Sequence, residues 1–251
     1  MSKAPKQRLD LLVVAKGLAP SRQQAQSLIM TGRILLDDVP CTKAGTKVRE
    51  DAAIRLKGEL LPFVSRGGLK LQGALQAFGE VTVAQKVCAD LGASTGGFTD
   101  CLLQGGATKV YAIDVGHNQL AWKLRQDPRV VVMERTNARH LESLPEAPSL
   151  VVGDLSFIGL GKILPAVVRI AAPGADCIFL IKPQFEVGPE NLAKGGLVKD
   201  EALREQAVEG VLDQARALHF QVLGCVESPI TGAKSGNVEY LAHLRLPAVI
   251  P

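Results

Sequence analysis

The sequence of 251 residues lacks any apolar run of 18 residues and has few aromatic side chains. Without such a run we expect no membrane-spanning helix, and because Lys16 interrupts the first apolar run we expect no signal peptide. Trp, Tyr and Phe make up 4% of the chain and hydrophobic residues as a whole 47%, which indicates an aliphatic core of the α/β type. The length suits one large domain, or one ordinary domain and a small one.

Cysteine is too scattered to indicate a disulfide framework or a metal site. The number is odd, no C-x-x-C pair occurs, and the residues are spread along the chain: Cys41, Cys88, Cys101, Cys177 and Cys225. Metal sites built on cysteine need closely spaced ligands, and disulfide frameworks usually have even numbers. We therefore expect reduced thiols in apolar surroundings, a cytoplasmic protein and no bound metal.

Positive charge is concentrated in the N-terminal part of the chain. Residues 1–60 hold 11 Lys and Arg against 6 Asp and Glu, a net charge of +5, whereas residues 61–251 hold 18 against 19, a net charge of −1. Lys and Arg gain affinity for a polyanion by displacing counterions from its phosphates, so this segment favours a polyanion as a partner. A solvated basic face without a partner is the alternative that charge alone leaves open.

The basic segment has the pattern of a small α+β domain. Residues 9–16 are predicted to form a helix, and Ser21 is a favoured cap for a second helix. That second helix would bury one apolar face, made of Ala25, Leu28 and Ile29. The remainder predicts short strands over residues 33–38 and 47–51, with turns at Val39–Pro40 and Ala44–Gly45.

This pattern resembles the S-four domain, a small RNA-binding domain first seen in a ribosomal protein of the small subunit. The resemblance is carried by Arg8-Leu-Asp, by Ser21-Arg22 at the start of a helix, and by Gly32-Arg33-Ile34 followed by Val39. It implies that Arg8, Arg22 and Arg33 contact RNA. We expect residues 1–60 to supply most of the affinity for RNA.

From Lys86 onward, short apolar runs alternate with helical patterns, which is typical of a doubly wound parallel sheet. Strands are predicted at KVCADL (86–91), KVYAIDV (109–115), RVVVME (129–134), SLVVGDL (149–155), DCIFLIK (176–182), FQVLGCV (220–226) and VEYLAHLRL (238–246). Helices are predicted over residues 97–105, 117–126, 159–171 and 200–218.

The stretch VCADLGASTGGFTDCLL, residues 87–103, joins the first of these strands to a helix through a glycine-rich turn. Glycines let the backbone approach a ligand closely, and free amides at a helix start favour an electronegative group. The spacing fits neither the dinucleotide fingerprint nor the phosphate-binding loop, and close packing of protein on protein is the alternative. We expect cofactor contacts from Asp90, Gly92, Ser94, Thr95, Gly96, Gly97 and Phe98.

A second acid indicates a ligand that contains a nucleoside. Asp114 follows the next strand, 22 residues after Gly92, where a carboxylate can accept hydrogen bonds from both hydroxyls of a ribose. Nicotinamide and S-adenosylmethionine enzymes both use an acid at this place, and an ordinary turn aspartate is the third possibility. Asn137, after the third strand, is placed to approach an adenine edge.

Polar residues at other strand ends indicate the chemistry. Asp154 and Lys182 close two strands, and the carboxyl ends of strands in an open α/β sheet meet at one crevice. An antiparallel last strand would bring Glu239 to the same rim, and Lys70 can arrive from the helix before the sheet. Partial burial beside a second cation makes a lysine amine easier to deprotonate, so Lys182 can act as a base toward a hydroxyl. Each of the four taken alone is as readily an ordinary surface ion-pair partner.

The whole chain is similar to the TlyA family, whose members are called hemolysin A or ribosomal RNA 2′-O-methyltransferases. The motifs that carry the resemblance are FVSRGGLKL, ADLGASTGGFTDCLLQGGA, YAIDVGHNQLAWKLRQDPRVVVMERTNAR, GDLSFIGL, IKPQFEVG, KGGLVKD and SPITGAKSGNVEYL. The resemblance implies an FtsJ-like Lys-Asp-Lys-Glu tetrad on Lys70, Asp154, Lys182 and Glu239, with S-adenosylmethionine as cofactor. It also adds Arg66 to the residues expected to contact RNA.

We therefore expect two domains, an S-four-like RNA-binding domain with its linker over residues 1–62 and a methyltransferase domain over residues 63–251. The second domain should have a Rossmann-like fold with seven strands, mostly parallel, and the last strand antiparallel. The expected partners are ribosomal RNA or ribosomal subunits. A non-catalytic RNA-binding or ribosome-assembly factor and a membrane-active hemolysin remain as alternative functions.

Overall fold

The computed structural model describes residues 5–58, 61–232 and 236–248, and the chain separates into two compact units, Met1–Leu61 and Pro62–Pro251. The boundary lies one residue before the position expected from the sequence. Within the described ranges, each unit has a hydrophobic core made of its own residues. Residues 233–235, which belong to the last family motif, lie outside the described residues.

The N-terminal unit combines two helices with two small antiparallel sheets, as expected for an α+β domain. The apolar face predicted for the second helix is buried, and Ser21 Oγ caps this helix by accepting a hydrogen bond from the Gln24 amide at 3.2 Å. One sheet pairs β1 with β4 and the other has the order β3-β2-β5. The elements are β1 (Lys6–Arg8), α1 (Leu9–Ala15), α2 (Arg22–Met30), β2 (Ile34–Leu36), β3 (Val39–Pro40), β4 (Lys47–Arg49) and β5 (Ile54–Leu56).

The prediction of a turn at Val39–Pro40 is wrong, because these two residues form strand β3. The turn lies at Asp37 and Asp38 instead, whose φ angles of 49° and 65° are those of a tight two-residue hairpin. Pro40 is tolerated because β3 is an edge strand, where the missing N–H is not needed for pairing. The turn predicted at Ala44–Gly45 is confirmed.

The C-terminal unit is built on a seven-stranded sheet with the order β11-β12-β10-β9-β6-β7-β8. Strand β12 runs antiparallel to both of its neighbours, and the other pairs are parallel. All seven predicted strands are confirmed, including the antiparallel last one. They are β6 (Val87–Leu91), β7 (Lys109–Ile113), β8 (Val130–Met133), β9 (Leu150–Gly153), β10 (Asp176–Ile181), β11 (Gln221–Glu227) and β12 (Tyr240–Arg245).

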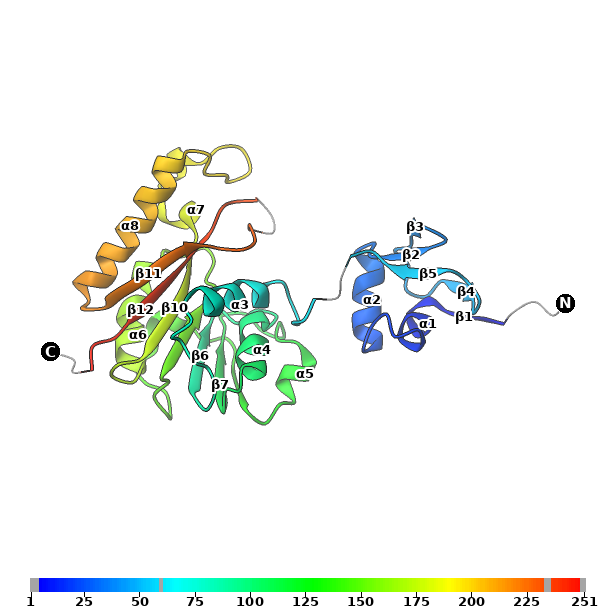
Figure 1. Ribbon diagram of the computed structural model, residues 1–251, viewed down its shortest axis with the longest axis horizontal. Coiled ribbons are helices and arrows are strands. Elements are labelled where there is room, and N and C mark those ends of the chain that lie inside the picture. The colour runs from blue at the N-terminus through cyan, green and yellow to red at the C-terminus, as the bar shows by residue number, and fades with distance from the viewer. Residues whose placement is uncertain (1–4, 59–60, 233–235, 249–251) are drawn as a thin grey trace. The chain divides into compact units, whose positions relative to one another are not determined.

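Helices cover both faces of this sheet (Figure 1). Along β10, alternate side chains enter two different core clusters, with Phe179 in one and Ile178 and Leu180 in the other. Helices α6 (Leu164–Ile170) and α8 (Glu201–Ala217) pack into the first cluster. Helices α3 (Gly67–Ala77), α4 (Gly97–Gln104) and α5 (Trp122–Arg125) pack into the second. The short α7 (Pro183–Glu186) and three single turns, η1 (Ala138–His140), η2 (Leu160–Lys162) and η3 (Pro189–Asn191), complete the unit.

Two predicted helices are shorter than expected. The helix predicted over residues 117–126 is confined to α5, because Asn118 has a φ of 56° and the loop before Trp122 turns back to Thr95 through a hydrogen bond from the Ala121 amide at 3.1 Å. The helix predicted over residues 159–171 is divided into η2 and α6. A regular pattern of apolar residues therefore overestimated helix length at both places.

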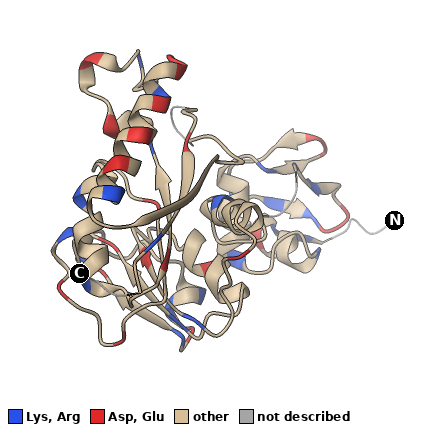
Figure 2. Cartoon of the chain, turned by 60° about the vertical axis from the view of Figure 1, so that its left-hand side comes forward, with Lys and Arg blue, Asp and Glu red and all other residues tan. Residues whose placement is uncertain are grey.

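Exposed carboxylates recur at every fourth position along α8 (Figure 2). The series consists of Glu201, Glu205, Glu209 and Asp213, and Arg216 pairs with its last two members. A row of like charges on one helix face repels a polyanion, so we do not expect RNA to lie along α8. Within the described residues, no helix combines the length and apolar character needed to cross a membrane.

The order of the strands reverses between β6 and β9, which lie side by side at the centre of the sheet. The chain proceeds from β6 to β7 and β8 in one direction, and from β9 to β10 in the other. In open α/β sheets a ligand binds outside the carboxyl ends of the strands at such a reversal. A ligand site is therefore expected at the loops after β6, β9 and β10.

Candidate functional site

A pocket of about 600 Å³ opens at the carboxyl ends of β6, β9 and β10. Its walls are the loops after these three strands, the first turns of α3 and α4, and the segment that leads into β12. All four residues predicted to form the catalytic cluster line it: Lys70, Asp154, Lys182 and Glu239. The strand reversal thus coincides with a pocket that contains the expected charged side chains.

These four side chains form a connected chain of ion pairs. Lys70 Nζ lies 2.6 Å from Glu239 Oε2 and 3.3 Å from Asp154 Oδ2, while Lys182 Nζ lies 2.5 Å from Asp154 Oδ1. Asp154, with 22% of its side chain exposed, is the most accessible of the four, and the other three expose less than 10%. Two cations and two anions compensate each other here, which makes burial of all four tolerable.

Lys182 lies at one end of this series of ion pairs, and Glu239 lies at the other. Besides its ion pair with Asp154, its amine donates a hydrogen bond to Ser156 Oγ at 2.8 Å and lies 5.8 Å from the centre of the Phe185 ring. The ion pair with Asp154 and the hydrogen bond to Ser156 thus fix the position of this amine in the wall of the pocket.

Glycines at the first turns of α3 and α4 let these two helices approach closely, and Lys70 lies in α3. The first turns of α3 and α4 touch at Gly67, Gly68 and Gly97, where a Cβ on Gly97 would lie 2.3 Å from Ser65 Oγ and 2.8 Å from the Gly68 nitrogen. A Cβ on Gly96, whose φ is 97°, would meet the side chain of Leu124 at 2.3 Å. Close packing against neighbouring protein atoms, the alternative considered for this turn in the sequence analysis, therefore accounts for the glycines at positions 96 and 97. Gly97 also lines the pocket.

Gly92 needs its lack of a side chain for two reasons. Its φ is 83°, and a Cβ would lie 3.0 Å from the backbone oxygen of Asp154. This close approach brings the turn after β6 against the loop after β9. Ser94, the next residue but one, has a φ of 48°, and non-glycine residues with positive φ are often found at functional sites.

Asp90 is a fully buried acid on the wall of the pocket. Its Oδ2 accepts hydrogen bonds from the amide and the hydroxyl of Thr99 at 2.9 and 2.6 Å, while its Oδ1 has no partner among the described residues. Burial raises the pKa of Asp90 to about 7, and the two bonds from Thr99 oppose this shift. An unpartnered carboxylate oxygen of this kind suits a positively charged ligand group, such as the ammonium of S-adenosylmethionine.

The two other predicted cofactor residues, Asp114 and Asn137, do not line the pocket. Asp114 accepts hydrogen bonds from the amides of Ser94 and Gly116, both at 2.7 Å, so it fixes the shape of the glycine-rich turn. Asn137 is exposed, and its Oδ1 caps η1 by accepting from the Arg139 amide at 3.1 Å. Ser94, Thr95 and Phe98 line the pocket, whereas Gly96 does not.

An aromatic pair that we did not predict from the sequence stands in the pocket wall. Phe157 is 88% exposed, has a φ of 64°, and lies 5.3 Å from Phe185 between ring centres. A bulky residue with positive φ is strained, and an exposed phenylalanine loses the free energy of burial. The available signal was the motif GDLSFIGL, in which an aromatic residue stands two residues after the end of a predicted strand.

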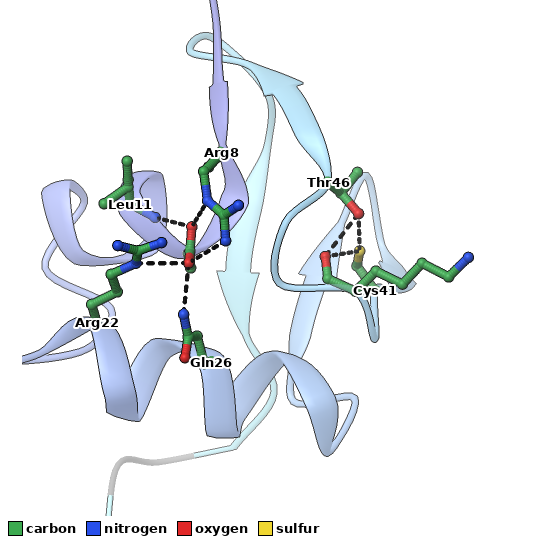
Figure 3. A network of polar contacts seen from close by, with 8 residues as sticks. Arg8, Leu11, Arg22, Gln26, Cys41 and Thr46 are labelled. Atoms are coloured by element: carbon green, nitrogen blue, oxygen red, sulfur yellow. Dashed lines mark hydrogen bonds and ion pairs between the residues drawn. The ribbon is translucent and has the colours of Figure 1, made fainter.

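Two of the predicted RNA-contacting arginines are organised by one acid (Figure 3). Asp10, whose side chain is fully buried, accepts hydrogen bonds from Arg8 at 2.9 and 3.0 Å, from Arg22 at 2.9 Å and from Gln26 at 2.9 Å. The hydrogen bonds from Arg8 hold the pKa of Asp10 well below its usual range. Arg8 and Arg22 still expose 43% and 53% of their side chains, so both guanidinium groups are pre-oriented at the surface.

The other two predicted RNA-contacting arginines lie in different units. Arg33 donates to the backbone oxygen of Lys57 at 3.3 Å in the N-terminal unit. Arg66 is an exposed residue that lines the pocket and donates to the backbone oxygen of Thr231. Arg66 is thus the member of the set that belongs to the pocket itself.

The five cysteines are free thiols. Burial raises the pKa of Cys88 and of Cys101 to about 12, so neither is a reactive thiolate at neutral pH. Cys41, in the N-terminal unit, lies 3.8 Å from Thr46 Oγ1 in the contact shown in Figure 3. The thiols are accounted for by packing, as the sequence indicated.

The fold and the pocket define an S-adenosylmethionine-dependent methyltransferase. Residues 63–246 match the family model of FtsJ-like methyltransferases, and residues 7–54 match the S4 (S-four) domain. A solved S-adenosylmethionine-dependent methyltransferase from Mesorhizobium loti shares the fold at a TM-score of 0.52 and 15% identity, over 69% of this chain and 96% of its own. S-adenosylmethionine is the cofactor of this class.

Proteins with higher sequence identity to this chain identify the family within this class. A Mycobacterium tuberculosis protein named 16S/23S rRNA (cytidine-2′-O)-methyltransferase TlyA is 49% identical over 96% of this chain and 91% of its own length. Hemolysin A of Brachyspira hyodysenteriae is 43% identical over 94% and 98%. A solved Streptococcus thermophilus structure covers 97% of this chain and 89% of its own, with a TM-score of 0.75 and 44% identity. The chain belongs to the TlyA family of FtsJ-like methyltransferases.

Proposed function

We propose that this protein methylates a ribose 2′-hydroxyl of ribosomal RNA, with S-adenosylmethionine as methyl donor and Lys182 as base. The observation that carries the proposal is the connected cluster of Lys70, Asp154, Lys182 and Glu239 in one pocket with the glycine-rich turn and Asp90. Because the relative from Mycobacterium tuberculosis is named for 2′-O-methylation of ribosomal RNA, we extend this substrate class to the present chain. Ribosomal RNA as substrate implies a reaction in the cytoplasm.

Each member of the cluster has a distinct task in this proposal. As the 2′-oxygen bonds to the methyl carbon and the sulfur–methyl bond breaks, the hydroxyl proton passes to Lys182 Nζ. Asp154 orients Lys182 and stabilises the ammonium that forms. Lys70 and Glu239 hold Asp154 in place, and the cluster, which carries one net negative charge while the Lys182 amine is neutral, becomes neutral when the proton arrives. Bound S-adenosylmethionine supplies an already activated methyl group, so positioning and proton removal remain for the protein.

The residues around the cluster suit a nucleotide of RNA. Phe157 and Phe185 offer an aromatic surface beside Lys182, and stacking of a base on such a surface contributes about 1–3 kcal/mol. Arg66 lies in the same pocket and suits a phosphate. The 2′-hydroxyl that would react is also the group that distinguishes RNA from DNA.

Transfer of labelled methyl groups from S-adenosylmethionine tests the proposal. Purified ribosomal subunits and their naked RNAs are incubated with the protein, and the nucleosides in a digest are then separated. Label in a ribose-methylated nucleoside supports the proposal. Label on a base would retain the cofactor and overturn the role of the cluster. Binding of the cofactor without label in any RNA would favour a non-catalytic RNA-binding factor.

Asp90 predicts a pH dependence of cofactor binding. Its carboxyl, with a pKa of about 7, is largely protonated at pH 6, whereas a cationic ligand favours the ionised form. Affinity for S-adenosylmethionine should therefore rise about tenfold between pH 6 and pH 7.5, measured by isothermal titration calorimetry. In Asp90→Asn the affinity should be lower and should no longer depend on pH in this range. A flat wild-type profile would contradict the assignment of Asp90 to the ammonium.

The N-terminal unit is expected to supply most of the RNA affinity. A chain that starts at Pro62 keeps both core clusters of the C-terminal unit, so it should fold and bind S-adenosylmethionine normally. Its affinity for ribosomal RNA should fall about a hundredfold in a filter-binding assay, with a shallower dependence on salt, because fewer phosphates are neutralised. RNA binding as tight as that of the full chain would refute this expectation.

A further inference from the structure

A small hairpin forms the pocket wall that follows α7. The Ala193 amide donates to the Leu197 oxygen at 2.9 Å, and these two residues pair as an antiparallel bridge. Gly195 and Gly196 have φ angles of 84° and 75° and line the pocket, and a Cβ on either would meet no protein atom within 4 Å. This wall therefore presents backbone to open space, where a ligand can approach closely.

One buried side chain holds this hairpin. Asn237 is 1% exposed, its Nδ2 donates to the Gly196 oxygen at 2.8 Å, and its Oδ1 accepts from the Val198 amide at 2.9 Å. The amide side chain thus pairs with the hairpin as a neighbouring strand would. An aspartate cannot donate to the Gly196 oxygen, and a leucine of similar size can neither donate nor accept.

Asn237 stands two residues before Glu239, so the hairpin and the charged cluster share one anchor. The backbone oxygen of Asn237 accepts from the Gly232 amide at 2.9 Å, and that of Glu239 accepts from the Ser228 amide at 2.8 Å. The Glu239 carboxylate then holds Lys70 at 2.6 Å. A displacement of this segment would move the glycine wall and the cluster together.

We infer that Asn237 is a positioning residue that fixes the hairpin of residues 193–197 relative to Glu239 and so aligns the bound nucleotide with the charged cluster. The inference rests on the proposed function, since it takes RNA as the ligand that meets the glycine wall. Replacing Asn237 should therefore affect the use of RNA and leave the binding of S-adenosylmethionine unchanged. The reason is that, within the described residues, the glycine-rich turn after β6 makes no hydrogen bond to Asn237.

The variants Asn237→Leu and Asn237→Asp test this role, and Asn191→Leu is the matched control. Asn191 lies at the end of η3, two residues before the hairpin, and is exposed, with a single long side-chain contact to Glu190 at 3.5 Å. In both Asn237 variants we expect KM for ribosomal RNA to rise about tenfold and kcat to fall several-fold, while Kd for S-adenosylmethionine changes less than about twofold. The control should match the wild type in all three quantities.

Hydrogen exchange provides a readout that does not depend on activity. The amide of Val198 should lose protection in Asn237→Leu but largely keep it in Asn237→Asp, which retains an accepting oxygen and loses only the bond to the Gly196 oxygen, and protection of β6 and β9 should stay unchanged in both. Adding Gly196→Ala to Asn237→Leu should raise KM by less than the product of the two single effects, because both changes disturb one contact.

Three outcomes would overturn the inference. If wild type and Asn237→Leu use RNA equally well although Val198 has lost protection, the hairpin does not align the nucleotide. If Kd for S-adenosylmethionine, KM and thermal stability all change together, Asn237 serves only the fold. If the wild type transfers no methyl group to any RNA, the proposed function fails, and this inference fails with it, whatever hydrogen exchange reports at Val198.

Discussion

Replacing Lys182 with alanine is expected to lower methyl transfer about 10³-fold, while affinity for S-adenosylmethionine changes less than about threefold. The reason is the role that we propose for the amine, which pairs with Asp154 at 2.5 Å, donates to Ser156 at 2.8 Å and lines the pocket, where it would accept the hydroxyl proton. Single-turnover methyl transfer and calorimetric titration of the cofactor measure the two quantities separately. A large loss of cofactor affinity would mean that Lys182 does not act as the base.

Lys182→Arg separates charge from proton transfer. Arginine keeps the positive charge and can bond Asp154, but it stays protonated and cannot accept a proton near neutral pH. We expect this variant to be as inactive as Lys182→Ala. Substantial activity would show that a cation, and not a base, is what the reaction needs. Lys199→Ala, at an exposed lysine, is the matched control and should leave the rate unchanged.

Replacing Asp176 with alanine is expected to lower the free energy of unfolding by about 2–3 kcal/mol. Asp176 lies at the start of β10, at the sheet edge opposite the pocket, and its side chain is 11% exposed. It pairs with Lys86 at 3.1 Å, His243 at 3.0 Å and Arg245 at 2.8 Å. Removing the acid leaves Lys86 and Arg245 close together without this counter-charge and leaves His243 with Glu80 at 3.4 Å, although the partial exposure of Arg245 reduces the cost.

Denaturant unfolding at several pH values measures this contribution. Although burial opposes the shift, the hydrogen bonds from His243, Arg245 and Lys86 hold the pKa of Asp176 below its ordinary value. Its stabilisation is therefore present at neutral pH and is lost as the pH falls below about 4. The difference between wild type and Asp176→Ala should shrink in that range. Asp213→Ala, which removes an exposed partner of Arg216, should cost less than about 0.5 kcal/mol at any pH.

The sheet could be predicted because its strands are buried on both faces. Runs such as CIFLI (177–181) are apolar throughout, and a polar residue follows at the strand end, so the positions of Asp154 and Lys182 followed from local pattern. The helix over residues 117–126 and the turn at Val39–Pro40 failed for another reason. There, backbone bonds and positive φ angles at Asn118, Asp37 and Asp38 decide the conformation, and these are weak signals in a sequence.

The site was predictable only where the topology carries residues to one edge. Lys70 and Glu239 lie outside the parallel strands. Glu239 was expected at the rim only if the last strand is antiparallel, and Lys70 only as a residue that the helix before the sheet could bring in; the resemblance to the TlyA family then implied that the four residues form one tetrad. The roles of Ser156 and Asn237 were not foreseen, because their partners are 26 and 39 residues away in the chain. Hydrogen bonds over such separations leave no periodicity that a single sequence can display.

The reversal of β12 has a consequence for how the protein can lose its function. Because this strand runs against β10 and β11, the residue that precedes it arrives at the same edge as the residues that follow β9 and β10. The charged cluster is therefore completed by the last strand of this sheet to be synthesised. A nascent or shortened chain can form the glycine-rich half of the pocket before it can form the half to which we assign proton removal, so under the proposed function methyl transfer requires the entire sheet to be assembled.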